Sequence, residues 1–374
     1  REKLLKNMTD QVKEAQLKLG YAKETVRLYY PVDSLNLGEI RENYGPNGLL
    51  GYDLANGYAD VTSYTQLGAF TCNGLLIALT RGQMMGKMAP LVKYVGLSSR
   101  EWLVSQRPWS KKERTFCWLL RHPEICRRYC MDTRMMDTLN RDPLGTLEAP
   151  VNNFVTPGSL TTAIGAGLFY HPDRMKQREL DRLGAETVAL THGGAQAFLS
   201  GAALAHLVSR SLWQPQISLG ELVSETAAAV NAQFHQQYPQ ACNELTLLLR
   251  LAVSMEKDAS LATWDVMEKL HCESAAQVLA GAVYACMAGA EEFDTSLIIA
   301  VNHSGRSAAV GAVAGALLGL RQGEAALPEF YTECLEPAEL LRELADDLWG
   351  GCPMELGNRL FDADWDHKYV HGGG

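Results

Sequence analysis

This chain of 374 residues lacks an excess of positive charge and has few aromatic residues. Its 34 Lys and Arg residues are outnumbered by 43 Asp and Glu residues, which gives a formal net charge of −9 at pH 7. Nucleic-acid binding needs clustered cations that neutralise phosphates, so we expect no nucleic-acid partner. One local basic run, between Lys111 and Arg128, is more typical of a solvated helix face.

The chain also lacks an apolar run long enough to span a bilayer. Its longest candidate, Ser307 to Leu320, has fourteen residues, whereas a spanning helix needs about 20. We therefore expect a core helix there and no membrane partner. The start at Arg1 has no basic-then-apolar signal pattern, and the absence of an initial Met leaves a processed or trimmed N-terminus open.

Cysteines are present but form no regular framework. Nine of them stand at irregular positions, which argues against a set of disulfides and favours a reducing cytoplasm. His122, Cys126 and Cys130 recur at intervals of four, as soft metal ligands on one helix face would. No fourth ligand is evident, so incidental cysteines on a helix are favoured.

Helical periodicity is what the sequence has in abundance, and alternating strand-like runs are nearly absent. Apolar residues recur at spacings of three and four in Thr65–Leu79, Gln196–Leu212, Leu219–Phe234, Ala275–Met287 and Pro337–Leu348, and an amphipathic helix is predicted at Leu4–Leu19. We predict an all-α chain that forms a single compact domain over 1–374. Residues 1–34 form a divergent N-terminal segment of it, and 366–374 a tail.

Three glycines mark one face of the apolar helix near the C-terminus. Gly311, Gly315 and Gly319 are four residues apart, so they share a helix face. Glycine costs helix stability, which suggests a packing need. We expect a second helix to approach this face closely.

Several segments resemble, in order and spacing, one known family. They are Ile40-Arg41-Glu42-Asn43-Tyr44-Gly45-Pro46-Asn47-Gly48, Thr62-Ser63-Tyr64-Thr65-Gln66-Leu67, Leu190-Thr191-His192-Gly193-Gly194 and the run from Ala300 to Leu318. Together they resemble the ADP-ribosylglycohydrolase family from about Leu35 to Leu348. The resemblance implies a compact helical fold, hydrolysis of ADP-ribosyl bonds and a site that holds two magnesium ions.

The positions that bind magnesium in the family are altered here. Where the family has Thr-Asp-Asp, this chain has Thr62, Ser63 and Tyr64. Where the family's run after Asn-His-Ser-Gly supplies two aspartates, Arg306 and Ala308 stand instead. Another acidic segment of the family falls over 25–29, which holds no acid. Magnesium is usually held through carboxylates, so we expect no metal and no cofactor.

Two further family elements give candidate site residues. The glutamate that assists water attack in some members falls near Asp33, which is the candidate catalytic residue. The family's phosphate and ribose loop corresponds to 154–162, of which only Gly158 is retained. Ser159 is a ligand-binding candidate beside it. His192 follows a family-like Thr-His pair, and without a nearby Ser or Cys nucleophile arrangement it is expected to hydrogen-bond at a helix start.

Arg306 is the main positive hypothesis, because a guanidinium at a former cation site can hold a diphosphate. The alternative is an internal ion pair with Asp60 or Asp33. Tyr64 either stacks on an adenine or ribose or fills the vacated metal cavity. The remaining ligand-binding candidates are Thr62, Ser63, Asn302, Ser304 and Ser307.

Loss of four metal carboxylates together argues against the family's chemistry. We therefore expect a catalytically inactive ADP-ribosylglycohydrolase-like protein that binds an ADP-ribosyl group, a related nucleotide or a protein partner. The alternative is a hydrolase with an altered, metal-independent site. A scaffold that works through its surface alone remains a third interpretation.

Overall fold

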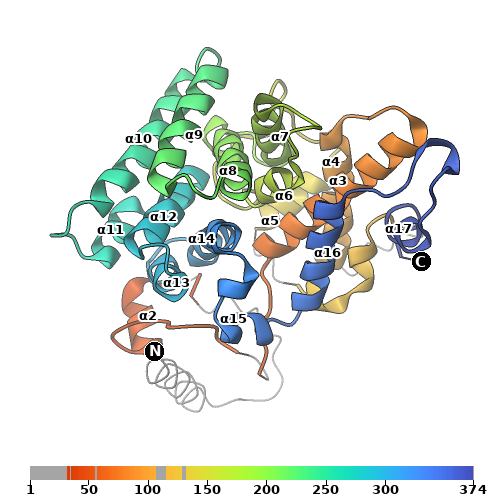
Figure 1. The fold of residues 1–374 in the computed structure, drawn as a ribbon. Helices are drawn as coiled ribbons and strands as arrows, with labels where there is room; N and C mark the ends of the chain where they lie inside the picture. The colour runs from red at the N-terminus through yellow and green to blue at the C-terminus, as the bar shows by residue number, and fades with distance from the viewer. Residues whose placement is uncertain (1–31, 34, 55–56, 107–114, 129–131, 374) are drawn as a thin grey trace.

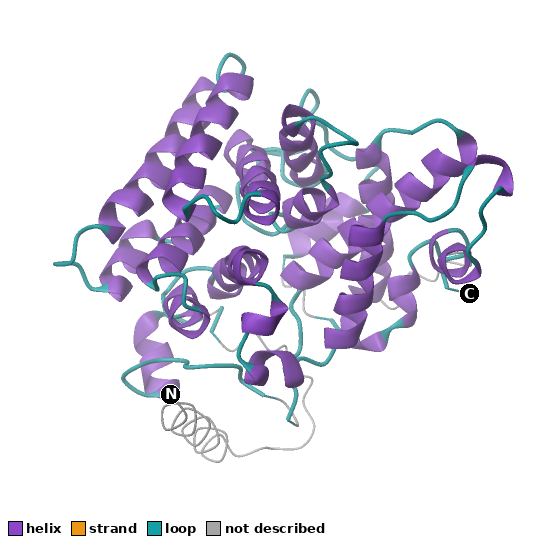
Figure 2. Cartoon of the chain, in the orientation of Figure 1, coloured by secondary structure: helices purple, strands orange, loops and turns teal. Residues whose placement is uncertain are grey.

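The structure is a computed structural model that describes residues 32–33, 35–54, 57–106, 115–128 and 132–373. Within these ranges the chain is all-α, as the sequence predicts, with no strand beyond one isolated bridge between Ala59 and Leu335 (Figure 2). The predicted helix at Leu4–Leu19 and the altered segment 25–29 lie outside the described residues.

The helices are packed around α14 and α3, which lie in the middle of Figure 1. Their bounds are α2 Leu37–Tyr44, α3 Ser63–Met85, α4 Leu91–Gln106, α5 Thr133–Leu139, α6 Thr162–Phe169, α7 Gln177–Ala189, α8 Ala195–Trp213, α9 Leu219–Phe234, α10 Pro239–Glu256, α11 Thr263–Leu270, α12 Ala275–Ala288, α13 Phe293–Val301, α14 Ser307–Gln322, α15 Glu329–Glu333, α16 Ala338–Gly350 and α17 Ala363–Tyr369. Short 3-10 helices occur at Trp118–Arg121, Pro123–Ile125, Glu324–Ala326 and Leu356–Asn358.

Side-chain caps fix where several helices begin. Asn36, Ser218 and Ser274 each accept a hydrogen bond from the backbone N–H three residues on, and the side-chain oxygen at that position accepts one from the backbone N–H of the cap residue. These reciprocal bonds satisfy N–H groups that the helix itself leaves unpaired. The five helices predicted from periodicity agree with α3, α8, α9, α12 and α16, most closely for α9, whose predicted and observed bounds coincide.

Glycines allow the closest helix crossing, between α7 and α8. A Cβ on Gly184 would lie 2.7 Å from the Gly201 carbonyl oxygen, and one on Gly201 would lie 2.6 Å from the Gly184 carbonyl oxygen. Contacts this short leave no room for any side chain. The crossing holds α8, most of which is buried, at the centre of a continuous hydrophobic core.

The glycine ladder on α14 does not do this, and the expectation of close helix approach there is wrong. A Cβ on Gly315 would meet only the Leu297 Cδ2 atom, at 3.8 Å, and one on Gly319 would meet nothing within 4 Å. Only Gly311 has a tight neighbour, Val301 Cγ1 at 3.0 Å. Spacing places these glycines on one face but does not reveal whether that face meets another backbone.

Two other local expectations differ from the structure. His122 separates two 3-10 helices, so His122 and Cys126 do not lie on one α-helix face. Cys130 lies outside the described residues. The expected tail at 366–374 includes the end of α17, where the Tyr369 hydroxyl donates to Asp347 at 2.5 Å and the ring is buried.

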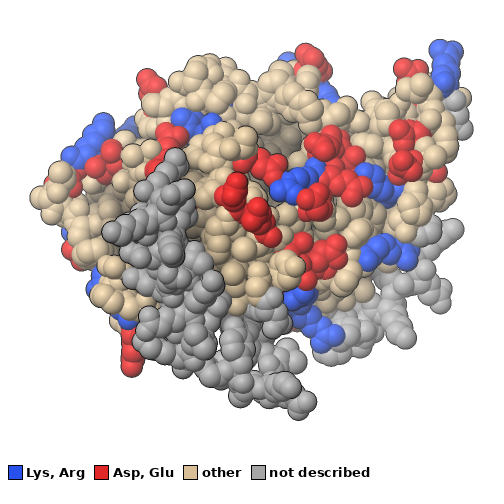
Figure 3. Space-filling view, turned by 60° about the horizontal axis from the view of Figure 1, so that its bottom comes forward, with Lys and Arg blue, Asp and Glu red and all other residues tan. Residues whose placement is uncertain are grey.

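The surface carries charges of both signs. On the face shown in Figure 3, acidic side chains gather near the middle, with Lys and Arg side chains among them. None of the helices in the described part of the chain combines the length and the apolar character that crossing a membrane requires.

Candidate functional site

A polar pocket of about 190 Å³ lies where α14 and α3 begin. It brings together five of the residues expected from the sequence: Asp33, Ser63, Tyr64, Gly158 and Arg306. These come from four distant parts of the chain, so the fold confirms that they are neighbours. The pocket is completed by Thr156 and Pro157, from the predicted phosphate and ribose loop, and by three residues that sequence reasoning missed, namely Asp132, Thr133 and Arg134. We call it the polar pocket below.

Arg306 is the N-cap residue of α14 and lines the polar pocket. Its Nε lies 3.1 Å from an Oε atom of Glu273, a partner that the sequence did not suggest. Asp60, one of the two expected partners, is instead paired with Arg127 at 2.9 Å. Burial works against the Arg306 charge, but Glu273 and Asp33 outweigh it and raise its pKa above the ordinary value. Its side chain remains 42% exposed, so the guanidinium stays accessible.

The loop before α14 is braced by a buried imidazole. The Nδ1 atom of His303 accepts a hydrogen bond from the Gly305 N–H at 3.0 Å. Its Nε2 lies 3.0 Å from the Ala300 carbonyl oxygen, which assigns the ring proton to Nε2 in a neutral ring. Burial lowers the pKa of His303 to about 4. This neutral ring therefore fixes the turn that presents Arg306.

Asp33 is held against the first turn of α14. One carboxylate oxygen accepts the Ala308 N–H at 2.8 Å. Burial raises the pKa of Asp33, while that hydrogen bond and the Arg306 charge partly offset the increase. A carboxyl with a raised pKa in a pocket is the kind of group that can exchange protons with a ligand.

Asp132 forms the other acidic wall, together with His192. One Asp132 oxygen lies 3.8 Å from the His192 Nε2, and the other accepts the Met135 N–H at 3.1 Å. Burial opposes ionisation of Asp132, but these hydrogen-bonding partners outweigh it and lower its pKa to about 2. Asp132 is therefore ionised at neutral pH.

His192 is fully buried behind this wall and has hydroxyl partners on both nitrogens. Its Nε2 lies 3.0 Å from the Thr156 Oγ1, and its Nδ1 lies 2.8 Å from the Ser159 Oγ. His192 has a hydrogen-bonding role, as expected, and the turn at 156–159 brings two hydroxyls to the ring that the sequence did not reveal. Gly158 allows this approach, since a Cβ there would lie 2.7 Å from Asp132 and 3.1 Å from His192.

Arg134 is the second cation of the polar pocket. Its guanidinium carbon lies 5.2 Å from the centre of the Phe154 ring, a cation–π distance, and its Nε is 3.8 Å from Asp132. Its side chain is 56% exposed. The sequence before Arg134 predicts a helix start and not a binding site, because Asp132 is a typical N-cap residue. The side chain of Asp132 does cap α5.

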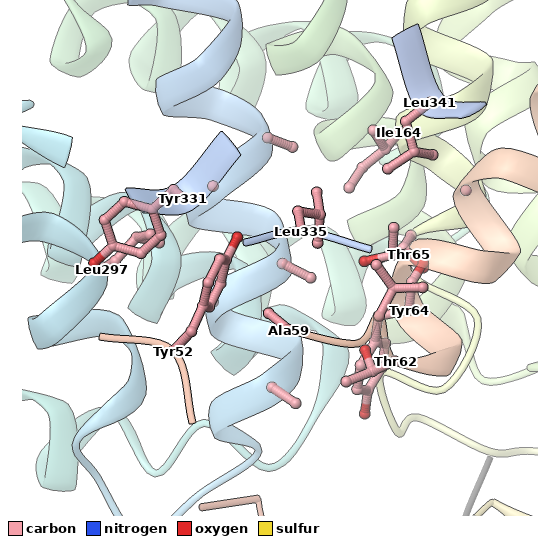
Figure 4. A pocket seen from close by; sticks show the side chains of 18 of the residues that line it. Tyr52, Ala59, Thr62, Tyr64, Thr65, Ile164, Leu297, Tyr331, Leu335 and Leu341 are labelled. Atoms are coloured by element: carbon pink, nitrogen blue, oxygen red, sulfur yellow. The ribbon is translucent and has the colours of Figure 1, made fainter. Parts of the chain in front are cut away.

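Tyr64 is buried and lines both the polar pocket and a larger apolar cavity beside it. Figure 4 shows its side chain near Thr62 and Thr65, at one side of that cavity. Tyr64 therefore occupies space between the two, as the cavity-filling interpretation expects. Its backbone carbonyl accepts the Thr161 hydroxyl at 2.6 Å, which fixes the start of α3 against α6.

The remaining candidates do not line the polar pocket. Thr62 faces the apolar cavity, and Ser159 is buried beside His192. Asn302 exchanges two hydrogen bonds of 2.8 Å with the backbone of Leu49, and Ser304 accepts the Leu37 N–H at 3.0 Å. Ser307 is buried and donates to the His303 carbonyl oxygen at 3.1 Å. These side chains hold segments together around the site.

The residues present do not fit the two magnesium ions that the family resemblance implies. Hard cations need several oxygen ligands, usually carboxylates. The carboxylates of the polar pocket are Asp33 and Asp132, and each is already bound to a backbone N–H. Among the residues described by the structure, no three or more His, Cys, Asp or Glu side chains are grouped so that they could hold a metal ion.

The chain is similar to solved structures and to two family models. A solved structure described as an ADP-ribosylglycohydrolase-related protein complex is similar, with 20% sequence identity, a TM-score of 0.39, and coverage of 77% of this chain and 98% of that chain. None of the curated proteins matches the sequence. The model of a domain of unknown function matches residues 1–42, and that of ADP-ribosylglycohydrolase matches residues 28–356. Since the latter match spans most of the sequence, this chain belongs to the ADP-ribosylglycohydrolase family.

Proposed function

We propose that this chain is a family member that binds an ADP-ribosyl group or a related nucleotide without hydrolysing it. The observation that carries the proposal is the pairing of Arg306 and Arg134 around one pocket whose former metal positions hold Ser63, Tyr64 and Arg306. Arginine forms two parallel hydrogen bonds with phosphate oxygens, so these side chains suit a diphosphate. In this account Arg306 and Arg134 supply the positive charge that metal ions supply in the family.

Both arginines can leave their present partners. Arg306 and Glu273 are 42% and 55% exposed, and such surface ion pairs contribute only about 0–1 kcal/mol. Arg134 is 3.8 Å from Asp132, beyond hydrogen-bond distance. The diphosphate of ADP-ribose, with one negative charge on each phosphate, would compete well with either carboxylate, because its oxygens accept several charge-assisted hydrogen bonds.

The size of the pocket limits what it can enclose. Sites that enclose drug-sized ligands have volumes of about 300–1,000 Å³, whereas the polar pocket has about 190 Å³. We therefore propose that it receives the phosphates or the adjoining ribose, and that the remainder of the ligand lies outside. The exposed arginine side chains at its edge are consistent with that placement.

Arg306→Ala and Arg134→Ala test this proposal by calorimetric titration with ADP-ribose. Loss of a hydrogen bond to a charged group is worth about 1.5–3 kcal/mol, so each change should weaken binding by roughly tenfold or more. The control is Arg342→Ala, which removes an equally exposed arginine paired with Glu324 and Glu339 away from the pocket. Equal affinity in all four proteins would contradict the proposal, as would absence of binding to the unaltered chain.

A second candidate function, metal-independent hydrolysis, is favoured by the His192 cluster. The Thr156 hydroxyl lines the polar pocket 3.0 Å from His192, and Asp132 lies beside the same ring nitrogen. An adjacent base can activate a hydroxyl nucleophile, and here the His192 ring and the Asp132 carboxylate both lie beside the Thr156 hydroxyl. Release of ADP-ribose from an ADP-ribosylated peptide in the presence of chelator, abolished by Thr156→Val and His192→Gln, would favour this function over simple binding.

A further inference from the structure

The larger cavity beside the polar pocket has no place in that function. It has a volume of about 620 Å³, within the range of small-molecule sites, and its surface is mostly apolar. Residues from α3, α13, α14 and α16 line it, together with residues from 49–53 and 59–62. Figure 4 shows Ile164, Leu297 and Leu341 around the open space. We call it the apolar cavity below.

Small residues on α14 create much of this space. Ala308, Gly311, Ala312, Gly315 and Ala316 all line the apolar cavity. A Cβ on Gly315 would have ordinary contact with Leu297 at 3.8 Å, which shows free volume above this glycine. At the tight crossings elsewhere, by contrast, an added Cβ meets backbone below 3 Å. Gly311 and Gly315 thus border the apolar cavity, although Gly311 also meets Val301 of α13 at 3.0 Å.

One polar group inside the apolar cavity is left without a partner. The ring of Tyr52 is fixed by an edge contact with Tyr331 at 4.9 Å and by Phe330 at 5.8 Å. Its hydroxyl points into the cavity in Figure 4 and makes no hydrogen bond to any described residue. Burial raises the pKa of Tyr52 to about 12, so the hydroxyl is neutral and can donate. A hydroxyl in a mostly apolar wall is a hydrogen-bonding partner that a ligand with one polar end can use.

The charges near the apolar cavity restrict what enters it. Asp53 and Asp60 both line it. Asp60 is paired with Arg127 at 2.9 Å, whereas Asp53 accepts only the neutral Tyr44 hydroxyl, at 3.0 Å, among the bonds formed by described residues. An anionic head group beside Asp53 would be repelled. A fatty acid carboxylate is therefore a poor occupant, and an uncharged polar end suits the site better.

We propose that the apolar cavity binds an uncharged amphiphile, a single hydrocarbon chain that ends in a hydroxyl group and hydrogen-bonds to Tyr52. The chain would lie along the small residues of α14, where each buried methylene contributes about 0.8 kcal/mol. The single hydroxyl would pair with the Tyr52 hydroxyl, which points into the cavity. This site is separate from the polar pocket, so it does not depend on ADP-ribose binding.

The probe is 1-decanol, and the measurement is the shift of the unfolding temperature at increasing probe concentration. A ligand that binds only the folded chain raises that temperature. We expect a rise with 1-decanol and a much smaller one with decanoate, which has the same chain length and a negative charge. Equal shifts with both probes would overturn the charge argument and the proposal with it.

Two phenylalanine substitutions locate the binding. Gly315→Phe fills the apolar cavity and should weaken 1-decanol binding at least fivefold, whereas Gly319→Phe, one turn along the same helix and outside the cavity, should leave it unchanged. Ala316→Phe is a second filling variant if the first does not fold. Tyr52→Phe should weaken binding about fivefold, the value of roughly one hydrogen bond. The same binding in the filled variants as in the Gly319→Phe control would overturn the proposal.

Discussion

The polar pocket and the apolar cavity share Tyr64 as a wall, yet they are built in different ways. In the polar pocket every carboxylate has a partner, and the two arginines are held only by exposed or distant acids. In the apolar cavity the wall is made by small side chains, and one hydroxyl has no partner. The same helix, α14, supplies Arg306 to one and its glycine face to the other.

In our proposal this difference reflects a change of chemistry within an unchanged helical fold. The polar pocket would replace the family's metal ions by arginine side chains. The apolar cavity depends on residue size alone, since the removal of a few side chains from one helix face leaves a space. Fold and function are thus separable within one pair of neighbouring sites.

Tyr64→Ala should have the largest effect, because it removes the common wall and joins the two spaces. Replacing a buried aromatic side chain by Ala costs about 3–5 kcal/mol, and we expect the lower end because space already exists on both sides. Urea unfolding measures the loss. Tyr58→Ala is the control, since that ring is 56% exposed and should change stability little. A loss no larger than that of the control would show that Tyr64 does not separate the sites.

His303 should make the polar side of the molecule sensitive to acid. Its pKa is about 4 in the folded chain against 6.5 for a free imidazole, so the unfolded state takes up the proton first. The stability is fully present above about pH 6.5 and is lost as the pH falls towards 4, by roughly 3 kcal/mol for this fully buried group.

Urea unfolding at several pH values between 7 and 4.5 measures this loss. His303→Gln should flatten the dependence, because the amide has no proton to gain in this range. His235→Gln, at an exposed position, should not. An identical pH dependence in the unaltered chain and in His303→Gln would contradict the assignment of the neutral ring.

Gly315→Ala tests whether the apolar cavity leaves space above this glycine. Ala is more favourable than Gly within a helix by about 1 kcal/mol, and the added Cβ meets only Leu297 at 3.8 Å, so the variant should be more stable by about that amount. Gly165→Ala, on α6, should be less stable than the unaltered chain, since its Cβ would lie 2.8 Å from the Gly68 carbonyl oxygen. Thermal unfolding distinguishes the two, and destabilisation by both would mean that no space lies above Gly315.

Glu273→Gln should have the smallest effect, and it should act on binding rather than stability. The Glu273–Arg306 pair is largely exposed, so its loss should change stability by less than about 1 kcal/mol. Freed from its carboxylate partner, Arg306 should bind ADP-ribose roughly two- to fivefold more tightly. Calorimetry measures this gain, and weaker binding would indicate that Glu273 orients the guanidinium.

The sequence predicts the helices well because each buries one apolar stripe. Ser218 and Glu221 even mark the first turn of α9, whose bounds agree with the prediction. The polar pocket is predictable only in part. Asp33, Tyr64 and Arg306 follow from the family's motifs, and their neighbourhood follows from its fold.

What the sequence could not predict depends on tertiary contacts made by loops. Arg134 and Asp132 reach the pocket from a segment of short helices, where periodicity is uninformative. Glu273 meets Arg306 because the loop between α11 and α12 lies against the start of α14. In that loop the Cys272 carbonyl oxygen accepts the Arg306 backbone N–H at 2.9 Å. The spacing of the α14 glycines is typical of a face packed against another helix. Only the positions of the other helices show that part of this face borders the apolar cavity.

The central claim is that protein cations have replaced the family's metal ions as the ligand contact. Calorimetric titration of ADP-ribose, first with magnesium and then with a chelator in excess, tests it most directly. We predict the same affinity in both conditions, because Arg306 and Arg134 supply the positive charge. Binding that appears only with magnesium would contradict this account, because it would require metal ligands that the polar pocket does not provide.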